Sequence, residues 1–272
     1  KVQQGVGRES DIGAKERKKR GAGDATIDVL EVTRGQIQVC VLGTTPLILN
    51  RLSEKAKHEL LLPGPKKNAA ARATTLKHQP LVEFRNSPYK LADPQAPTLL
   101  AGLAAWFKQA IMTAALDLPG TKKTQIGRLT YVDGDRLPIY GIPELFMAPV
   151  RSADMNRTPD IRTRAIIPRW ACRLSVTFVE PLMRAQAVLR LLAAAGVFCG
   201  VGDWRLQKGS GTYGLFELVE LDDPRFQEVV REGGRAAQEA AMEHPACYDT
   251  ESEELFSWFS DELERRQLKG AA

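Results

Sequence analysis

The sequence lacks the long apolar runs that mark membrane proteins. None of its apolar stretches approaches the roughly 20 residues that cross a bilayer. Residues 1–23 are basic and contain no apolar core, so they do not have the pattern of a secretory signal. We therefore expect a cytoplasmic protein that does not interact with membranes.

Cysteine and histidine are scarce as well. The four cysteines form no CxxC pair, and only three histidines are present. A zinc site needs several such ligands close together. Three of the cysteines, Cys40, Cys172 and Cys199, lie in apolar segments, where a free thiol packs as a small hydrophobic group. The sequence therefore predicts no metal, no other cofactor and no disulfide.

Familiar catalytic motifs are also missing. The chain contains no P-loop, no GxSxG nucleophile turn and no HExxH helix. His58 and His78 are candidate general bases, which leaves a metal-independent RNA endonuclease open as an alternative. The missing motifs favour a binding protein over an enzyme.

Charge is distributed unevenly along the chain. Residues 220–272 contain 14 acidic and 6 basic side chains, whereas residues 1–219 contain 32 basic and 19 acidic ones. A basic body followed by an acidic segment is typical of proteins that bind polyanions. The alternative interpretation is a solvent-exposed surface whose charge is unevenly distributed but which does not bind a polyanion.

Hydrophobic periodicity predicts both strands and helices. Apolar alternation predicts strands over 27–32, 36–42 and 170–178, with the first two separated at Arg34-Gly35. Shorter strands are expected at 81–84, 89–91, 129–132, 137–140, 145–147, 197–201 and 214–221. Helices are expected at 53–60, 98–116, 183–195, 224–243 and 252–268. This order predicts an α+β fold, a sheet with helices on one face.

The same features divide the chain into three parts. Residues 1–26 form a basic arm that we expect to be disordered, because KERKKR lies in a glycine-rich context. Residues 27–221 form the expected nucleic-acid-binding domain. Residues 222–272 form an acidic helical segment, which is a candidate surface for partner proteins.

Arginine is concentrated in the stretch between residues 151 and 173. It contains Arg151, Arg157, Arg162, Arg164, Arg169 and Arg173, against only Asp154 and Asp160. Guanidinium groups bind phosphate through two parallel hydrogen bonds and also stack on bases. Arg162 and Arg164 share a face if this stretch is extended. A salt-bridged surface loop is the alternative interpretation.

A glycine-rich segment, GVGDWRLQKGSGTYGLF, spans residues 200–216. Glycine allows close approach of the backbone to a ligand, and aromatic rings between cations suit the exposed bases of single strands. We expect both segments to line a shared groove for single-stranded DNA or RNA. The expected lining residues are Arg51, Lys55, Lys66, Lys67, Arg151, Arg157, Arg162, Arg164, Arg169, Trp204, Arg205, Lys208 and Tyr213. A long hairpin in which Trp204 covers the core is the alternative.

Two segments of the chain resemble known families. The glycine-rich segment after helix 183–195 resembles the glycine-rich loop of the RAMP superfamily, the ferredoxin-like RNA-binding proteins of CRISPR systems. The chain is also similar to uncharacterised phage and prophage proteins in which TPLI…R…SEKAK (45–57 here) precedes VGDWR…KG…GxF (201–216 here). This second similarity spans about residues 37–218.

The resemblance implies a modified ferredoxin-like (RRM- or RAMP-like) antiparallel sheet with helices on one face and inserted loops. It implies a non-catalytic protein that assembles along a single strand as a homo-oligomer or filament, in phage replication or recombination or in a CRISPR-like backbone. Processing endonucleases of that superfamily often have a histidine near the first helix, roughly where His58 lies. A phage structural or assembly protein is the third alternative.

Overall fold

The computed structural model describes residues 29–52, 57, 61, 76–151, 159–208 and 211–266. Lys1–Glu31 and Val32–Ala272 form two units, and the second contains every helix and strand described below. The arm expected at 1–26 and most of the helix expected at 53–60 lie outside the described residues. Among the helices that are described, none is long and apolar enough to cross a membrane.

The larger sheet is antiparallel and has the strand order β10-β1-β9-β6-β4-β3, with β5 also paired to β9. Its strands are β1 (Thr33–Gly43), β3 (Tyr89–Lys90), β4 (Leu100–Leu103), β5 (Thr130–Val132), β6 (Arg136–Tyr140), β9 (Ala171–Glu180) and β10 (Phe216–Val219). β1 and β9 pair from Thr33 opposite Glu180 to Leu42 opposite Ala171. The protein is therefore built from helices and a mainly antiparallel sheet, as the expected α+β class requires.

Apolar alternation places one face of this sheet in the core. Cys172, Leu174, Val176 and Phe178 of β9 are buried, which confirms the alternation predicted over 170–178. β1 follows the same pattern, with Val39 buried and Gln38 exposed. It runs through Arg34 and Gly35 without interruption, so the separation predicted there is wrong.

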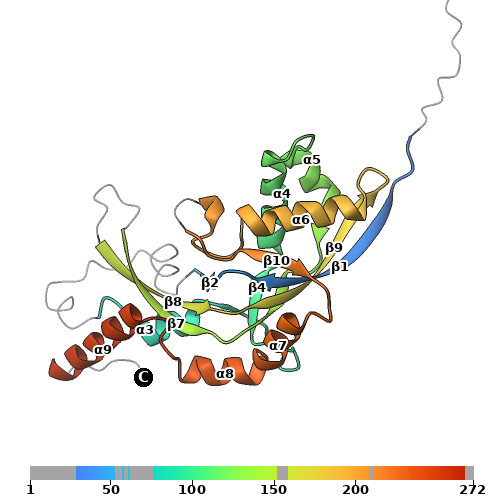
Figure 1. Cartoon of the computed structure of the whole chain (residues 1–272). Helices are drawn as coiled ribbons and strands as arrows, with labels where there is room; N and C mark the ends of the chain where they lie inside the picture. The colour runs from blue at the N-terminus through green and yellow to red at the C-terminus, as the bar shows by residue number, and fades with distance from the viewer. Residues whose placement is uncertain are drawn as a thin grey trace, which may run out of the picture. The chain divides into compact units, whose positions relative to one another are not determined.

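Helices cover both faces of the larger sheet. α4 (Ala104–Asp117) and α6 (Ala185–Phe198) pack side by side on one face, and α5 (Lys123–Leu129) packs against α4. α7 (Pro224–Glu232) covers part of the opposite face, where Phe226 is buried against Leu42 and Ala171. Figure 1 shows α4 and α6 above the sheet and α7 below it. The expectation of helices on one face alone is therefore wrong.

A second antiparallel sheet has the strand order β2-β8-β7. It contains β2 (Leu47–Leu49), β7 (Glu144–Arg151) and β8 (Pro159–Ile167), and β7 and β8 pair along their whole length. α3 (Pro80–Asn86) contacts both β7 and β8, and α9 (Thr250–Arg265) contacts β7. Within the described residues, the arginine-rich stretch therefore lies mostly in strands, at the end of β7, along β8 and at the start of β9, and is not one long loop.

Several predicted elements differ from the structure. Residues 81–84 belong to helix α3, which Pro80 begins, because proline is favoured in a first helical turn. The helix expected from 98 begins only at Ala104, after strand β4. The strand expected at 197–201 is the end of α6 and the turn that follows, because the apolar stripe of α6 continues past Gly196 to Phe198. Val29–Val32 are described, and none of them is in a strand.

Gln238 ties the acidic C-terminal part of the chain to the larger sheet. It lies in α8 (Arg235–Glu243) and is fully buried. Its side-chain carbonyl accepts hydrogen bonds from the backbone nitrogens of Leu99 and Leu100 at 2.8 and 2.9 Å. Its amide donates to the carbonyls of Ile139, Gly141 and Gly233 at 2.8 to 3.0 Å. One side chain thus joins α8 to the strand regions around β4 and β6.

Candidate nucleic-acid interface

The described part of the glycine-rich segment, residues 200–208 and 211–216, packs on the outer face of the smaller sheet, and we call it the glycine-rich loop. The backbone nitrogen of Asp203 donates to the carbonyl of Ile48 at 3.0 Å. The ring centroids of Trp204 and Tyr213 lie 5.7 and 6.2 Å from that of Phe146 on β7. Tyr248 lies 5.6 Å from the same ring. We call Phe146, Trp204, Tyr213 and Tyr248 the aromatic cluster; the last three are only partly buried.

The glycines of this loop serve its own folding. Gly214 has φ +73°, and a Cβ atom there would lie 1.8 Å from the carbonyl oxygen of Val201. A Cβ atom at Gly211 would lie 1.6 Å from the carbonyl oxygen of Trp204. Trp204 itself adopts a left-handed backbone with φ 48°, which is uncommon for a residue with a side chain. These glycines allow the loop to fold tightly and present the Trp204 ring.

Arginines of β8 meet the loop at this surface. Phe146 pairs with Arg164 and Ala148 with Arg162, so the two arginines share a face, as predicted for an extended segment. The guanidinium of Arg164 lies 5.2 Å from the centre of the Trp204 ring. The arginine-rich stretch and the glycine-rich loop therefore come together at Arg164 and Trp204.

Arg164 is already neutralised within the protein. It forms an ion pair with Asp203, and its side chain is only 11% exposed. Burial lowers the pKa of Arg164, and the Asp203 carboxylate opposes this change. Asp203 also accepts a hydrogen bond from the side-chain amide of Asn50 at 3.0 Å. Arg164 thus holds Trp204 and Asp203 in place and has little surface left for a ligand.

Other predicted cations near these elements are more accessible. The side chain of Arg162 is 50% exposed and lies 3.5 Å from Asp160. Arg151, at the end of β7, and Lys208, at the end of the short 3-10 helix η1 (Leu206–Lys208), are exposed. Arg205 is partly buried and donates to the carbonyl of Gly202 at 2.7 Å, so it shapes the loop. Arg51 is partly buried just after β2, where its backbone nitrogen donates to the carbonyl of Ser87.

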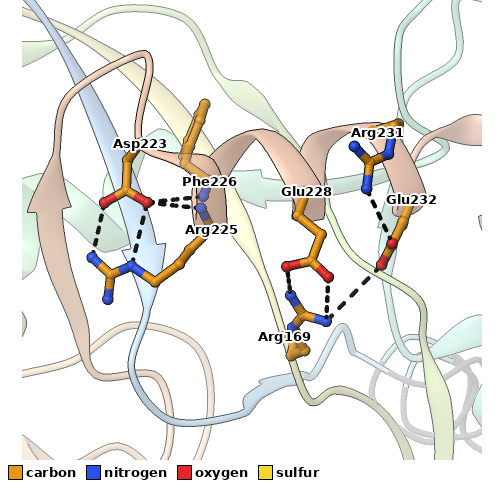
Figure 2. A network of polar contacts seen from close by, with 7 residues as sticks. All are labelled: Arg169, Asp223, Arg225, Phe226, Glu228, Arg231 and Glu232. Atoms are coloured by element: carbon orange, nitrogen blue, oxygen red, sulfur yellow. Dashed lines mark hydrogen bonds and ion pairs between the residues drawn. The ribbon is translucent and has the colours of Figure 1, made fainter.

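Arg169 is held elsewhere. Its guanidinium lies 2.7 Å from Glu228 and 3.9 Å from Glu232 of α7. Figure 2 shows both contacts. The hydrogen bond with Glu228 raises the pKa of Arg169. Asp223, in the same view, caps the start of α7 through the backbone nitrogens of Arg225 and Phe226. Arg169 therefore pairs with α7 from the turn between β8 and β9, and the structure does not bring it to the glycine-rich loop.

His78 is fully occupied by carboxylates. Nδ1 lies 2.9 Å from Glu83 and Nε2 lies 2.8 Å from Asp160. The hydrogen bond with Glu83 is the main reason that the pKa of His78 is raised. Burial raises the pKa of Asp160, but hydrogen bonds from Lys77 and His78 outweigh it and lower the value to about 2. A ring held by carboxylates at both nitrogens is poorly suited to act as a general base.

Sequence reasoning missed two members of the aromatic cluster. Phe146 was assigned to a short strand, and its position opposite Arg164 follows only from the register of the β7–β8 hairpin. Tyr248 lies in the acidic segment and reaches the cluster because its backbone nitrogen donates to the carbonyl of Leu145. In the sequence, the spacing of Phe146 and Ala148 by two residues indicates that both lie on one face of a strand, and this signal could have pointed to Phe146.

Part of the predicted groove lies outside the described residues. This applies to Lys55, Lys66, Lys67 and Arg157, and also to His58. Within the described part of the chain, no three His, Cys, Asp or Glu side chains are placed to hold a metal ion. No protein-family model matches the chain, and no curated protein sequence matches it.

Proposed function

We propose that this protein binds single-stranded DNA or RNA without cleaving it, at the surface formed by β8 and the glycine-rich loop. One observation carries the proposal: arginines of β8 and the aromatic side chains of the loop, distant in sequence, lie together. Arg164 stacks on Trp204 at 5.2 Å, and Arg162 lies on the same strand face.

The chemistry of this surface suits a strand whose bases are unpaired. Phosphates would be neutralised by the exposed Arg162 and Lys208, which makes affinity dependent on salt. Bases would stack on the partly exposed rings of Trp204 and Tyr213, each stack contributing about 1–3 kcal/mol. Arg164 acts here as a positioning residue, since Asp203 already neutralises it.

The strand order supports a modified ferredoxin-like fold for the larger sheet. The elements β1, α4, β5–β6, β9, α6 and β10 follow the order βαββαβ, with the strands arranged β10-β1-β9-β6. Split βαβ units of the ferredoxin-like kind have this succession of elements. In this interpretation β2, α3, β3 and β4 are inserted between the first strand and the first helix of the fold, and the β7–β8 hairpin is inserted between its second and third strands.

The wider setting of the proposal follows from the family resemblance. The protein would assemble along the strand as a homo-oligomer or filament in the cytoplasm, in phage replication or recombination or in a CRISPR-like complex. The acidic C-terminal part would present a surface to partner proteins. Assembly along a strand depends on binding, which is therefore tested first.

Binding can be measured by fluorescence anisotropy with labelled single-stranded DNA, single-stranded RNA and duplex DNA of one length. The double variant Arg162→Glu/Lys208→Glu should weaken single-strand binding about tenfold or more at low salt and reduce the salt slope by about two. Arg128→Glu on α5 is the matched control and should change little. Equal affinity of the double variant and the unmodified protein would show that this surface does not bind the strand.

A further inference from the structure

β1 has one fully paired edge and one that is half open. On the β9 side, pairing extends from Thr33 to Leu42. On the other side, β10 pairs only with Cys40–Gly43, and no described strand pairs with residues 33–39. Unpaired backbone donors and acceptors at a strand edge are a template for another strand. This open edge, TRGQIQV, contains no proline and only one charged residue, Arg34.

A groove with both polar and apolar lining runs beside the open edge. It is lined in part by Val39 of β1, Leu189 and Ala193 of α6, and Leu218 and Leu221 around the end of β10. Leu221 is 53% exposed, and Val32, which directly precedes β1, is 54% exposed. Apolar side chains are thus exposed to solvent at both ends of the unpaired edge.

We propose that the open edge of β1 pairs with the same edge of a second copy of this chain, antiparallel and about a two-fold axis at Gln36. This register places Thr33 opposite Val39, Arg34 opposite Gln38, Gly35 opposite Ile37 and Gln36 opposite itself. No two like charges face each other, so the edge is complementary to itself. A two-fold contact of this kind closes after two copies.

Charge and apolar surface both favour a second copy as the occupant. The register brings Arg34 of each copy toward the acidic turn after β10 of the other, which contains Glu220 and Asp222. All three side chains are exposed, and within the described part of the chain none of them forms an ion pair. The same register brings Val32 of one copy toward Leu221 of the other, which would remove apolar surface from water.

This contact would supply a pairwise unit for the proposed assembly, but it requires no nucleic acid. It also uses residues other than those of the aromatic cluster. Its test is therefore carried out without nucleic acid, so that failure of this interface and failure of the proposed binding are distinguishable.

The first experiment is sedimentation velocity of the full chain over a dilution series. The unmodified protein should show a monomer–dimer equilibrium. Gln38→Arg sets like charges opposite Arg34 at two symmetric positions and should weaken the dimer about fivefold or more, whereas Gln38→Glu should strengthen it by several-fold. Gln125→Arg and Gln125→Glu, on the exposed surface of α5, are the matched controls and should have no effect.

The second experiment tests the register directly. Residues directly opposite each other in antiparallel strands have Cα atoms about 4.5–5.5 Å apart, a distance that a disulfide can bridge. Gln36→Cys should therefore form a covalent dimer under mild oxidation, and Gln125→Cys should not. A chain that is monomeric at every concentration, a dimer that appears only with nucleic acid, or a dimer insensitive to the charge at position 38 would each overturn the proposal.

Discussion

His78 joins helix α3 to strand β8 through both nitrogens of its ring. Glu83 lies on α3 and Asp160 lies on β8, so the imidazole bridges two carboxylates from different elements. Only the protonated ring can donate to both carboxylates at once. Folding therefore favours the charged form, in agreement with the raised pKa of His78.

This arrangement predicts a pH dependence of stability with a definite sign. Because the folded pKa lies above the ordinary 6.5, the contribution of His78 is fully present below that value and is lost as pH rises through the folded pKa. Asp160, with a pKa of about 2, remains charged throughout this range. His78→Gln should remove the effect.

Urea unfolding of the unmodified protein and of His78→Gln, from about pH 6 to about pH 9, measures this contribution. The difference in unfolding free energy between the two proteins should be largest at the acidic end and shrink toward the alkaline end. A difference that is constant across the range would mean that the pKa of His78 is the same in the folded and unfolded protein.

The glycine-rich loop is an element whose backbone conformation determines which residues it accepts. Gly214 and Gly120 have nearly the same left-handed φ, +73° and +79°. They differ in their surroundings, because a Cβ atom at Gly214 would meet Val201, whereas a Cβ atom at Gly120 would have nothing within 4 Å. Comparing substitutions at these two glycines therefore separates the cost of backbone strain, which both share, from the cost of steric overlap, which only Gly214 has.

Gly120→Ala should cost about 1–2 kcal/mol of unfolding free energy, the amount expected for a left-handed residue with a side chain. Gly214→Ala should cost distinctly more, about 3 kcal/mol or more, because the loop backbone must move as well. Chemical denaturation of both variants provides the comparison. Equal losses would indicate that the loop adjusts freely around position 214.

Elements with strong periodicity were predicted well, and the short strands expected at 89–91, 129–132, 137–140, 145–147 and 214–221 coincide with β3, β5, β6, β7 and β10. The alternation over 170–178 and the helical spacing around Phe107 and Leu192 reflect packing against one core, so the pattern is visible in sequence. In β8, by contrast, Arg162 and Arg164 stand on the outer face. Their density suggested a loop, although Ile161, Thr163 and Ala165 alternate with them on the face toward α3 and α9.

The sequence predicted which residue types make up the candidate site, but not which of these residues contact one another. The residue types of the arginine-rich stretch and the glycine-rich loop indicated that they could share a ligand. Which arginine meets Trp204 depends on strand register, and a shift by one residue would reverse the faces of β8. The sequence likewise had no signal that Asp203 neutralises Arg164 or that Arg169 faces α7.

At the scale of the whole molecule, Gln238 connects regions that are far apart in sequence. Its side chain meets backbone groups at residues 100, 139 and 233, and these three contacts are buried. A buried backbone group that loses its partner costs about 1–3 kcal/mol. The acidic C-terminal helices are thus part of the same folded body as the sheet.

Gln238→Leu keeps a side chain of moderate size but removes every one of these hydrogen bonds. We expect it to lower the unfolding free energy by about 3 kcal/mol or more, measured by thermal or urea denaturation. Gln125→Leu, on the surface of α5, should change it by less than about 0.5 kcal/mol. Comparable losses in both variants would contradict the role given to Gln238.

The place of β1 in the sheet has a consequence for how the polypeptide is made. β1 is synthesised before both of its neighbours in the sheet, β9 and β10, which end at Glu180 and Val219. Contacts between segments so far apart in sequence close slowly. A nascent chain emerging from the ribosome therefore carries β1 with both edges unpaired until β9 has been translated, and with the β10 edge unpaired until residue 219 has been translated. This is the stage at which a holding chaperone would protect β1 most.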